Sequence, residues 1–220
     1  MTQLTKLLSN CDHTDLRTVA TQADIFNLID DAIAFDTASV CIPPCYVREA
    51  VAYAAGRMPI CTVIGFPNGY HSTRVKVFET EEAVKDGAEE IDMVINVGYL
   101  KSGNTQALLR EIREVRAACQ GKILKVIIEA CLLTEEEKIL ACRLVSEAGA
   151  DFIKTSTGFS SGGATAEDVR LLRQNVAQKV KVKAAGGIRT KEAAEEMLTA
   201  GADRLGASAL VALAKKELER

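Results

Sequence analysis

Short apolar runs alternate with longer amphipathic segments along the whole chain. The runs lie about 20 to 35 residues apart, which is the length of a strand, a helix and two short loops. The first of these runs, at residues 10–14, is the least apolar. They span residues 10–14, 38–42, 60–66, 91–97, 123–129, 152–156, 180–185 and 204–207. Because most of these runs are apolar at consecutive positions, we expect strands that are covered on both faces.

The segments between these runs carry the marks of helices. After Thr21, for example, Ile25, Ile29 and Ala32 recur at helical spacing. Three segments begin with a threonine followed three positions later by an acid, as in a capping box: Thr21/Asp24, Thr134/Glu137 and Thr165/Asp168. Glycine stands where a helix should pass into the next strand, at Gly87, Gly149 and Gly201.

Alternating strands and helices predict an α/β protein with a parallel sheet. Eight strand–helix units predict a closed (β/α)8 TIM barrel, formed by residues 1–220 as a single domain with a short N-terminal helix. An open doubly wound sheet is the alternative. It would be favoured by a GxGxxG motif after the first strand, and the sequence has none there.

Composition narrows the class of protein. Of 220 residues, 27 are Lys or Arg and 30 are Asp or Glu, a net charge of −3, so we expect no nucleic-acid or membrane partner. No signal peptide or spanning segment is expected either. The seven cysteines form no CxxC pair and the two histidines join no cluster with them. This pattern predicts reduced thiols in a cytoplasmic protein without a metal site or other cofactor.

In a barrel of this kind functional residues lie at the carboxyl ends of the strands. Lys154 and Lys183 stand near the ends of two neighbouring predicted strands. At ~4 Å and an effective dielectric constant of ~20, two ammonium groups repel by about 4 kcal/mol. One lysine could then be a neutral amine and act as a Schiff-base nucleophile. The alternative is that both lysines point outward between helices.

The fourth and fifth predicted strands carry charges of opposite sign. Asp92 would share a strand face with Val94 and Asn96, where an unpaired carboxylate is costly. It is a candidate acid–base group facing the lumen, or else one half of a structural ion pair. Lys125, on the next strand, is a candidate partner in the same network.

Glycine clusters follow the last two predicted strands, at Gly186-Gly187 and at Gly206-Ala207-Ser208. The loops after strands seven and eight often bind phosphate through backbone N–H groups, although glycine pairs also occur in ordinary turns. Near the first strand, His13 fits a structural role better than a catalytic one. Cys41 ends the second strand, either as a pocket residue or as a buried, inert thiol.

Taken together, these segments resemble the deoxyribose-phosphate aldolase family over about residues 10–210. The resemblance is carried by Asp12-His13-Thr14, Glu90-Ile91-Asp92-Met93-Val94-Ile95-Asn96, Leu124-Lys125-Val126-Ile127-Ile128-Glu129, Phe152-Ile153-Lys154-Thr155-Ser156-Thr157-Gly158-Phe159 and Val182-Lys183-Ala184-Ala185-Gly186-Gly187-Ile188-Arg189. The family is a barrel class I aldolase that cleaves 2-deoxy-D-ribose 5-phosphate to acetaldehyde and D-glyceraldehyde 3-phosphate without a metal.

The resemblance implies a role for each matching residue. Lys154 would form the Schiff base, Lys183 would perturb it and move protons, and Asp92 would relay protons. The phosphate would be bound by Gly158, Gly186, Gly187, Gly206 and Ser208. Supporting positions would be Asp12, Lys125, Thr155 and Cys41. The partners would be a sugar phosphate and aldehydes, and a homo-oligomer is expected, with a dimer favoured.

Two positions depart from the family pattern. Ala207 stands where we expect a small hydroxyl residue, and the given sequence ends at Leu218-Glu219-Arg220 without the tyrosine tail that some members use in proton transfer. Other functions remain open: a transaldolase-like Schiff-base barrel, or a barrel that binds sugar phosphates without catalysis. A metal-dependent aldolase is disfavoured by the lack of a histidine cluster.

Overall fold

The eight predicted strands close into one parallel barrel. The computed structural model describes residues 3–218, so residues 1–2 and 219–220 of the expected domain, and with them the last two positions of the C-terminal segment, lie outside the described part. Each strand pairs with its neighbours in chain order, and β8 pairs with β1. The strands are β1 Cys11–Thr14, β2 Ser39–Ile42, β3 Ile60–Ile64, β4 Glu90–Val94, β5 Ile123–Ile127, β6 Phe152–Lys154, β7 Lys181–Ala185 and β8 Arg204–Ala207. The predicted TIM barrel is confirmed.

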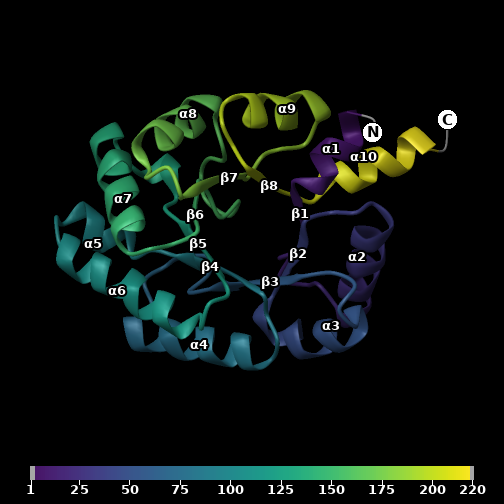
Figure 1. Ribbon diagram of the computed structural model, residues 1–220, viewed down its shortest axis with the longest axis horizontal. Coiled ribbons are helices and arrows are strands. Elements are labelled where there is room, and N and C mark those ends of the chain that lie inside the picture. The colour runs from purple at the N-terminus through teal and green to yellow at the C-terminus, as the bar shows by residue number, and fades with distance from the viewer. Residues whose placement is uncertain (1–2, 219–220) are drawn as a thin grey trace.

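Helices surround the barrel on its outer side (Figure 1). The first and last helices contact each other, so the two ends of the chain lie on the same side of the ring. The helices are α1 Gln3–Ser9, α2 Gln22–Ala34, α3 Val47–Ala54, α4 Thr73–Lys85, α5 Val97–Lys101, α6 Thr105–Ala118, α7 Glu135–Glu147, α8 Ala166–Asn175, α9 Lys191–Thr199 and α10 Ala209–Leu218, with 3-10 turns η1 Pro44–Tyr46 and η2 Ala130–Leu132. No helix within residues 3–218 is long and apolar enough to cross a membrane.

The predicted helix caps are present. Thr21 and Thr134 form complete capping boxes with Asp24 and Glu137, and the side chain of Thr165 accepts a hydrogen bond from the backbone of Asp168. The glycines predicted to end helices lie one position beyond the last cap residue with positive φ, from 76° at Gly149 to 112° at Gly201. These local signals place the helices along the chain and therefore the strands between them.

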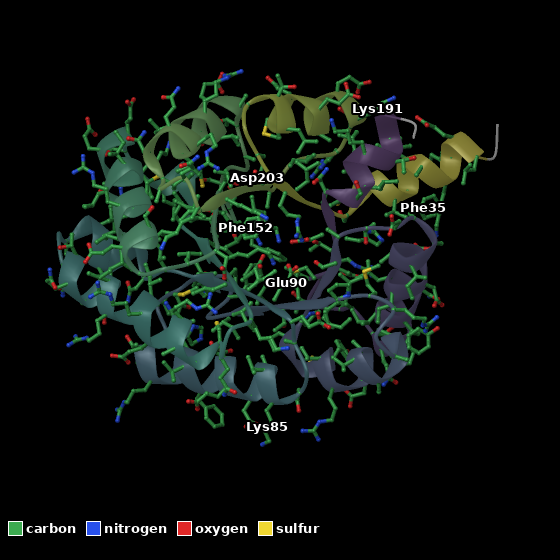
Figure 2. All side chains as sticks on the ribbon, viewed as in Figure 1. Phe35, Lys85, Glu90, Phe152, Lys191 and Asp203 are labelled. Carbon is green, nitrogen blue, oxygen red and sulfur yellow. The ribbon has the colours of Figure 1, made fainter. Side chains whose placement is uncertain are left out.

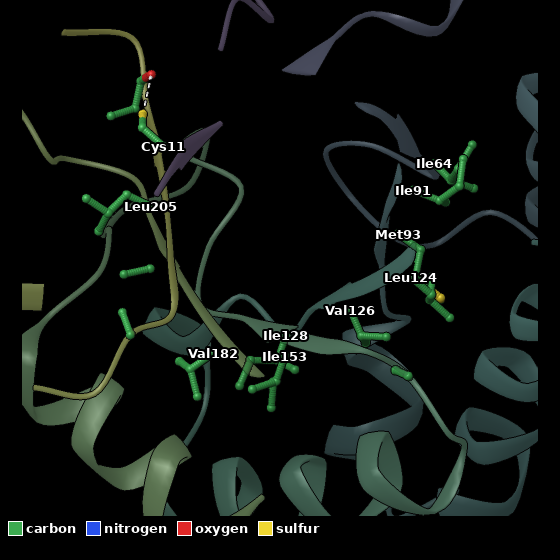
Figure 3. Close-up of a cluster of buried hydrophobic side chains, with 14 of the residues drawn as sticks. Cys11, Ile64, Ile91, Met93, Leu124, Val126, Ile128, Ile153, Val182 and Leu205 are labelled. Atoms are coloured by element: carbon green, nitrogen blue, oxygen red, sulfur yellow. Dashed lines mark hydrogen bonds between the residues drawn. The ribbon is translucent and has the colours of Figure 1, made fainter. Parts of the chain in front are cut away.

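Two different layers lie inside the ring of helices. Alternate strand residues point outward and pack against the helices in an aliphatic core, part of which is drawn in Figure 3, with Ile91, Leu124 and Val182 among its members. The other strand residues point into the barrel, where many of them are charged. Figure 2 shows Glu90 and Phe152 inside the ring, whereas Lys85 lies at its periphery. Because charges buried in the lumen are costly when unpaired, each of these side chains needs an ion-pair or hydrogen-bond partner.

Several strands end earlier than the sequence predicts. The fourth strand stops at Val94, and the side chain of Asn96 caps α5 by accepting a hydrogen bond from the backbone of Tyr99. The prediction that Asn96 shares a strand face with Asp92 was therefore wrong. The fifth strand stops at Ile127, and Glu129 adopts a left-handed conformation with φ of 51°. Asn96 and Glu129 therefore follow the fourth and fifth strands instead of ending them.

Candidate active site

Strand register brings the predicted lysines together. Lys154 on β6 is the direct partner of Lys183 on β7, and Asp92 on β4 is the partner of Lys125 on β5. All four side chains point into the barrel, where each lysine contacts the carboxylate of Asp92. Lys125, Lys183 and Asp92 have no exposed surface, and Lys154 is 3% exposed. The alternative that both lysines point outward is wrong.

Lys154 is the member of this group that reaches the pocket. A cavity of about 380 Å³ opens at the carboxyl ends of the strands and includes Lys154, whereas Asp92, Lys183 and Lys125 do not line it. Its wall is formed by the carboxyl ends of β1, β6, β7 and β8, the loops that follow them and one residue of α2, Leu28. The lining residues are Thr14, Asp15, Leu16, Arg17, Leu28, Lys154, Thr157, Gly158, Phe159, Ala185, Gly186, Gly187, Ile188, Arg189, Gly206, Ala207 and Ser208. A ligand in this cavity would meet the amine of Lys154.

One carboxylate oxygen joins the two lysines. Lys154 Nζ and Lys183 Nζ each donate to Oδ2 of Asp92 at 2.7 Å. Two contacts of that length to one atom place the nitrogens no more than 5.4 Å apart. Lys183 also donates to Asp12 Oδ2, whereas Asp92 is the only carboxylate that forms an ion pair with Lys154 among the described residues.

The network continues away from the pocket. Lys125 Nζ lies 2.8 Å from Asp92 Oδ1 and 2.5 Å from Glu90 Oε2. Arg204, on β8, contacts Asp12 Oδ1 at 2.5 Å and Glu90 Oε2 at 3.4 Å. The charged side chains therefore form one connected cluster through the lumen.

The cluster controls the ionisation of its members. Burial would raise the pKa of Asp92, but Lys125, Lys154 and Lys183 outweigh it and hold that pKa well below its usual value. Burial likewise opposes ionisation of Asp12, and the cations around it still lower its pKa. For Lys183 burial would lower the pKa, yet the carboxylates of Asp12 and Asp92 raise it. Lys183 is therefore a fixed cation beside Lys154.

Counting the charges shows an imbalance. The cluster contains three carboxylates, on Asp12, Glu90 and Asp92. It contains four basic side chains, on Lys125, Lys154, Lys183 and Arg204. With every group ionised, a buried net charge of +1 remains, which is costly in a low-dielectric interior. Loss of one proton makes the cluster neutral. Lys154 has the fewest carboxylate contacts and is the one that lines the pocket.

The predicted glycine loops meet at the same end of the barrel. Gly158, Gly186, Gly187, Gly206 and Ser208 all line the pocket. Gly186 and Gly187 have φ of 88° and 78°, a conformation that side chains disfavour. Gly206 lacks a side chain for a different reason, because a Cβ there would lie 3.1 Å from Cε of Lys183 and 2.9 Å from Cβ of Ala185. Ser208 is exposed and directly precedes α10.

Comparison with known proteins agrees with this geometry. A model of the family described as DeoC/LacD family aldolase matches residues 7–215. The chain belongs to the DeoC/LacD aldolase family. It is 54% identical over 211 residues to deoxyribose-phosphate aldolase of Streptococcus pyogenes serotype M4, covering 96% of this chain and 95% of that protein. A solved deoxyribose phosphate aldolase from Aeropyrum pernix, described as tetrameric, has a TM-score of 0.90 and 32% identity over 98% of this chain and 93% of its own. The structure of an aldolase called QR15 has a TM-score of 0.92 and 39% identity, over 97% and 96%.

Two of the supporting positions lie behind the pocket of this aldolase. Thr155 is fully buried and ties β6 to β7: its hydroxyl donates to Ala185 O and accepts from Ala185 N, both at 3.1 Å. Cys41 is fully buried and packs with Cys61 and Val63 inside the barrel. It therefore does not line the pocket, in agreement with the alternative that it is a buried thiol.

Some residues that shape the site escaped the sequence analysis. Glu90 and Arg204 belong to the lumen cluster, and Cys61 Sγ lies 3.2 Å from Asp92 Oδ1. Glu129 accepts hydrogen bonds from the backbone and hydroxyl of Thr157, which lines the pocket. The nearest signal was Glu90 itself, two positions before Asp92 and so on the same strand face.

A further overlooked residue, Gly163, packs against the loop after β7. A Cβ at this position would lie 2.4 Å from the carbonyl oxygen of Gly186. The backbone of Ala164 also donates to that oxygen at 3.0 Å. The loop after β6 therefore supports the predicted phosphate loop directly.

Within residues 3–218, two groups of side chains bring three ligand atoms close enough to contact one metal ion: Cys41, Cys61 and Asp92, and Asp12, Cys61 and Glu90. The ammonium groups of Lys125 and Lys183 already contact the carboxylates in both groups. A metal cation would have to displace these lysines, so the charge distribution disfavours metal binding at either place.

Proposed function

We propose that this aldolase cleaves 2-deoxy-D-ribose 5-phosphate reversibly to acetaldehyde and D-glyceraldehyde 3-phosphate through a Schiff base on Lys154. The substrate is inferred from the names of the relatives, deoxyribose-phosphate aldolases at 53 to 54% identity. The chemistry is inferred from one observation. Lys154 lines the pocket and shares an oxygen of Asp92 with the fixed cation Lys183.

The charge on Lys183 prepares Lys154 to act as a nucleophile. Two positive charges 5.4 Å apart repel by about 3 kcal/mol at an effective dielectric constant of ~20. Because Lys183 has two carboxylate partners and Lys154 has one, the proton is lost from Lys154. Its free amine then attacks the carbonyl carbon of the open-chain sugar.

The carbinolamine loses water to give an iminium ion, which withdraws electrons from the neighbouring carbon–carbon bond. The hydroxyl at C3 loses its proton, the C2–C3 bond breaks, and glyceraldehyde 3-phosphate departs, leaving an enamine on Lys154. Protonation of the enamine and hydrolysis of the imine release acetaldehyde. Asp92 and Lys183 do not line the pocket, so they exchange protons with the substrate through water.

The phosphate binds in the loops after β6, β7 and β8, at Gly158, Gly186, Gly187, Gly206 and Ser208. Backbone N–H groups and the start of α10 supply the donors, since the amino end of a helix favours anions. Binding there fixes the distance between the carbonyl carbon and Lys154.

Borohydride trapping with acetaldehyde, followed by peptide mass spectrometry, tests the chemistry. We expect a reduced two-carbon adduct on Lys154 and none in Lys154→Met. Lys181, an exposed lysine on β7, is the internal control. An adduct on Lys183 would exchange the roles of the two lysines, and a folded protein with no adduct would refute the mechanism. Cleavage of 2-deoxy-D-ribose 5-phosphate, with other sugar phosphates for comparison, tests the substrate.

Assembly and location extend the proposal. The protein forms a homo-oligomer, and a dimer was favoured from the sequence, whereas the Aeropyrum pernix relative is described as tetrameric. Light scattering in solution separates a dimer from a tetramer. A cytoplasmic location is supported by the cysteines, because all seven are free thiols.

A further inference from the structure

The lumen cluster extends from the pocket towards the opposite end of the barrel. Lys154 Nζ contacts Asp92 at 2.7 Å, Asp92 contacts Lys125 at 2.8 Å, and Lys125 contacts Glu90 at 2.5 Å. Glu90 contacts Arg204 at 3.4 Å. Glu90 is the first residue of β4 and Arg204 the first of β8, so both lie at the amino ends of their strands. The substrate pocket is at the carboxyl ends, and neither residue lines it.

We propose that Glu90 and Arg204 are positioning residues that set, from the closed end of the barrel, how readily Lys154 loses its proton. This inference rests on the proposed Schiff-base function of Lys154. Glu90 supplies the third negative charge of the cluster and Arg204 the fourth positive charge. Their two charges cancel, so the pair leaves the excess of one positive charge in the cluster unchanged, and a change to either charge alone alters that excess.

Burial is the reason that distant charges act on Lys154. Glu90 is 4% exposed, and the atoms that connect it to Lys154 belong to Asp92 and Lys125, which are not exposed at all. Water therefore screens this path little. The three contacts place the charges of Glu90 and Lys154 no more than roughly 10 Å apart, and at that distance one unit charge shifts an ionisation by about one pH unit at an effective dielectric constant of ~20.

Each strand contributes an ionisable group to this lumen. The buried groups are Asp12 on β1, Cys41 on β2, Cys61 on β3, Glu90 and Asp92 on β4, Lys125 on β5, Lys154 on β6 and Lys183 on β7, together with Arg204 on β8. Lys181, an exposed residue of β7, lies with Arg204 over the ring of Phe152. Burial raises the pKa of Cys61 well above its usual value, so this thiol stays uncharged. A contact with Cys61 lowers the pKa of Cys41, which makes a Cys41 thiolate the competing way to neutralise the cluster.

Opposite substitutions at the two positions give opposite effects. In Glu90→Gln one negative charge is lost, so Lys154 gives up its proton at lower pH. In Arg204→Gln one positive charge is lost, so Lys154 keeps its proton to higher pH. Each change should move the acid limb of Lys154 reactivity by about one pH unit. The double variant restores the charge balance and should return the limb to its original place.

The measurement is the pH dependence of carbamoylation of Lys154 by cyanate, a small reagent that attacks neutral amines, followed by peptide mass spectrometry in the full-length protein. Lys216, an exposed lysine on α10, is the internal reference in the same protein, and Arg204→Lys is the control that preserves charge. Opposite shifts for the two single variants support the inference. Coincident profiles, or shifts in the same direction, overturn it.

Two further variants keep the test decisive. If Arg204→Gln does not fold, Glu90→Gln against Glu90→Asp still separates charge from shape, because only the first should move the profile. Cys41→Ala examines the competing thiolate. A Cys41→Ala profile that moves as far as the Glu90→Gln profile would assign the charge balance to Cys41 and overturn the inference.

The inference and the proposed function fail in distinguishable ways. Borohydride trapping of acetaldehyde by the unsubstituted protein tests the Schiff base alone. Trapping on Lys154 together with unmoved cyanate profiles refutes the role of Glu90 and Arg204 and leaves the aldolase mechanism intact. Moved profiles without trapping refute the mechanism and leave the electrostatic coupling established.

Discussion

Lys154 and Lys183 are direct partners on adjacent strands, and their amino groups donate to the same oxygen of Asp92. A single carboxylate oxygen cannot neutralise two ammonium groups. The second carboxylate partner of Lys183, Asp12, decides which of the two lysines remains charged. The asymmetry between two chemically identical side chains thus arises from their neighbours.

Lys183→Leu should reduce turnover at pH 7 by about 100-fold. With Lys183 absent, the cluster is neutral only when Lys154 carries its proton, and a repulsion of about 3 kcal/mol that favours the free amine is lost. We expect the acid limb of the rate profile to move to higher pH. Lys181→Leu, on the same strand but exposed, is the matched control. A Lys183→Leu variant with a near-normal rate at pH 7 would refute the role assigned to Lys183.

Gly163→Ala should weaken binding of the phosphate while preserving the nucleophile. Its Cβ would lie 2.4 Å from the backbone oxygen of Gly186, so the loop after β7 must move. We expect KM for the phosphorylated substrate to rise about 10-fold, because a displacement of this kind costs on the order of 1.4 kcal/mol in binding. Acetaldehyde should still be trapped on Lys154.

Gly98→Ala provides the comparison for that substitution. Gly98 lies in α5, outside the pocket, and a Cβ there would meet only the side chain of Asn96, at 3.1 Å. KM should then stay within twofold of the original value. Equal KM values for Gly163→Ala and the unsubstituted protein would show that the loop after β6 does not support the phosphate site.

Much of the fold could be predicted because local signals agree with one another. Capping threonines and terminal glycines delimit the helices, and apolar runs fill the intervals as strands. In a closed parallel barrel, strands that are neighbours in sequence are neighbours in space, so the pairing of Lys154 with Lys183 could be predicted from the sequence alone. The same reasoning predicted that Asp92 and Lys125, on the next pair of adjacent strands, belong to one network.

The remainder depends on contacts between distant segments. Alternation places Glu90 on the strand face of Asp92, but no local pattern shows that Glu90 lies within reach of Arg204 on β8. The importance of Gly163 depends on how closely two loops approach each other, which has no periodicity in sequence. Asn96 looked like a strand residue because nothing local distinguishes the last strand position from a helix cap. The register that pairs Lys154 with Lys183 could therefore be inferred from the sequence, whereas the packing of the loop after β6 against the loop after β7 could not.

Acid should destabilise the folded protein through the lumen carboxylates. The pKa values of Asp12 and Asp92 lie below the ordinary value of 3.8 in the folded state. A carboxyl whose pKa is depressed by folding contributes stability above its unfolded pKa, and this contribution is lost as the pH falls. We therefore expect the free energy of unfolding to fall steadily below about pH 4, by about 1.4 kcal/mol for each pH unit and each group that takes up a proton on unfolding.

Urea unfolding at a series of pH values measures this dependence. Asp86→Asn is the control, because the ion pair of Asp86 with Arg48 is on the surface and contributes little. Its pH dependence should parallel that of the unsubstituted protein. A stability that stays flat between pH 6 and pH 3 would contradict the low pKa values of the two lumen carboxylates.

A second buried ion pair lies outside the barrel and offers a test of stability without catalysis. Lys76 on α4 and Glu111 on α6 are both fully buried, 2.9 Å apart, and Lys76 Nζ also donates to the carbonyl of Val94 at 2.8 Å. Lys76→Met leaves Glu111 without its partner and should lower the free energy of unfolding by about 3 to 5 kcal/mol. Burial already raises the pKa of Glu111, so the isolated carboxyl should take up a proton more readily.

The double variant Lys76→Met/Glu111→Gln separates the cost of an unpaired charge from the loss of packing. The amide oxygen of Gln can still accept the hydrogen bond that Glu111 accepts from the backbone of Asn96 at 3.0 Å. Much of the lost stability should therefore return, since replacing both members of a buried pair costs less than removing one. Lys85→Met, which breaks an exposed pair with Glu82, should change stability by less than about 1 kcal/mol. If the double variant is as unstable as Lys76→Met, packing of the lysine side chain rather than its charge stabilises the contact between α4 and α6.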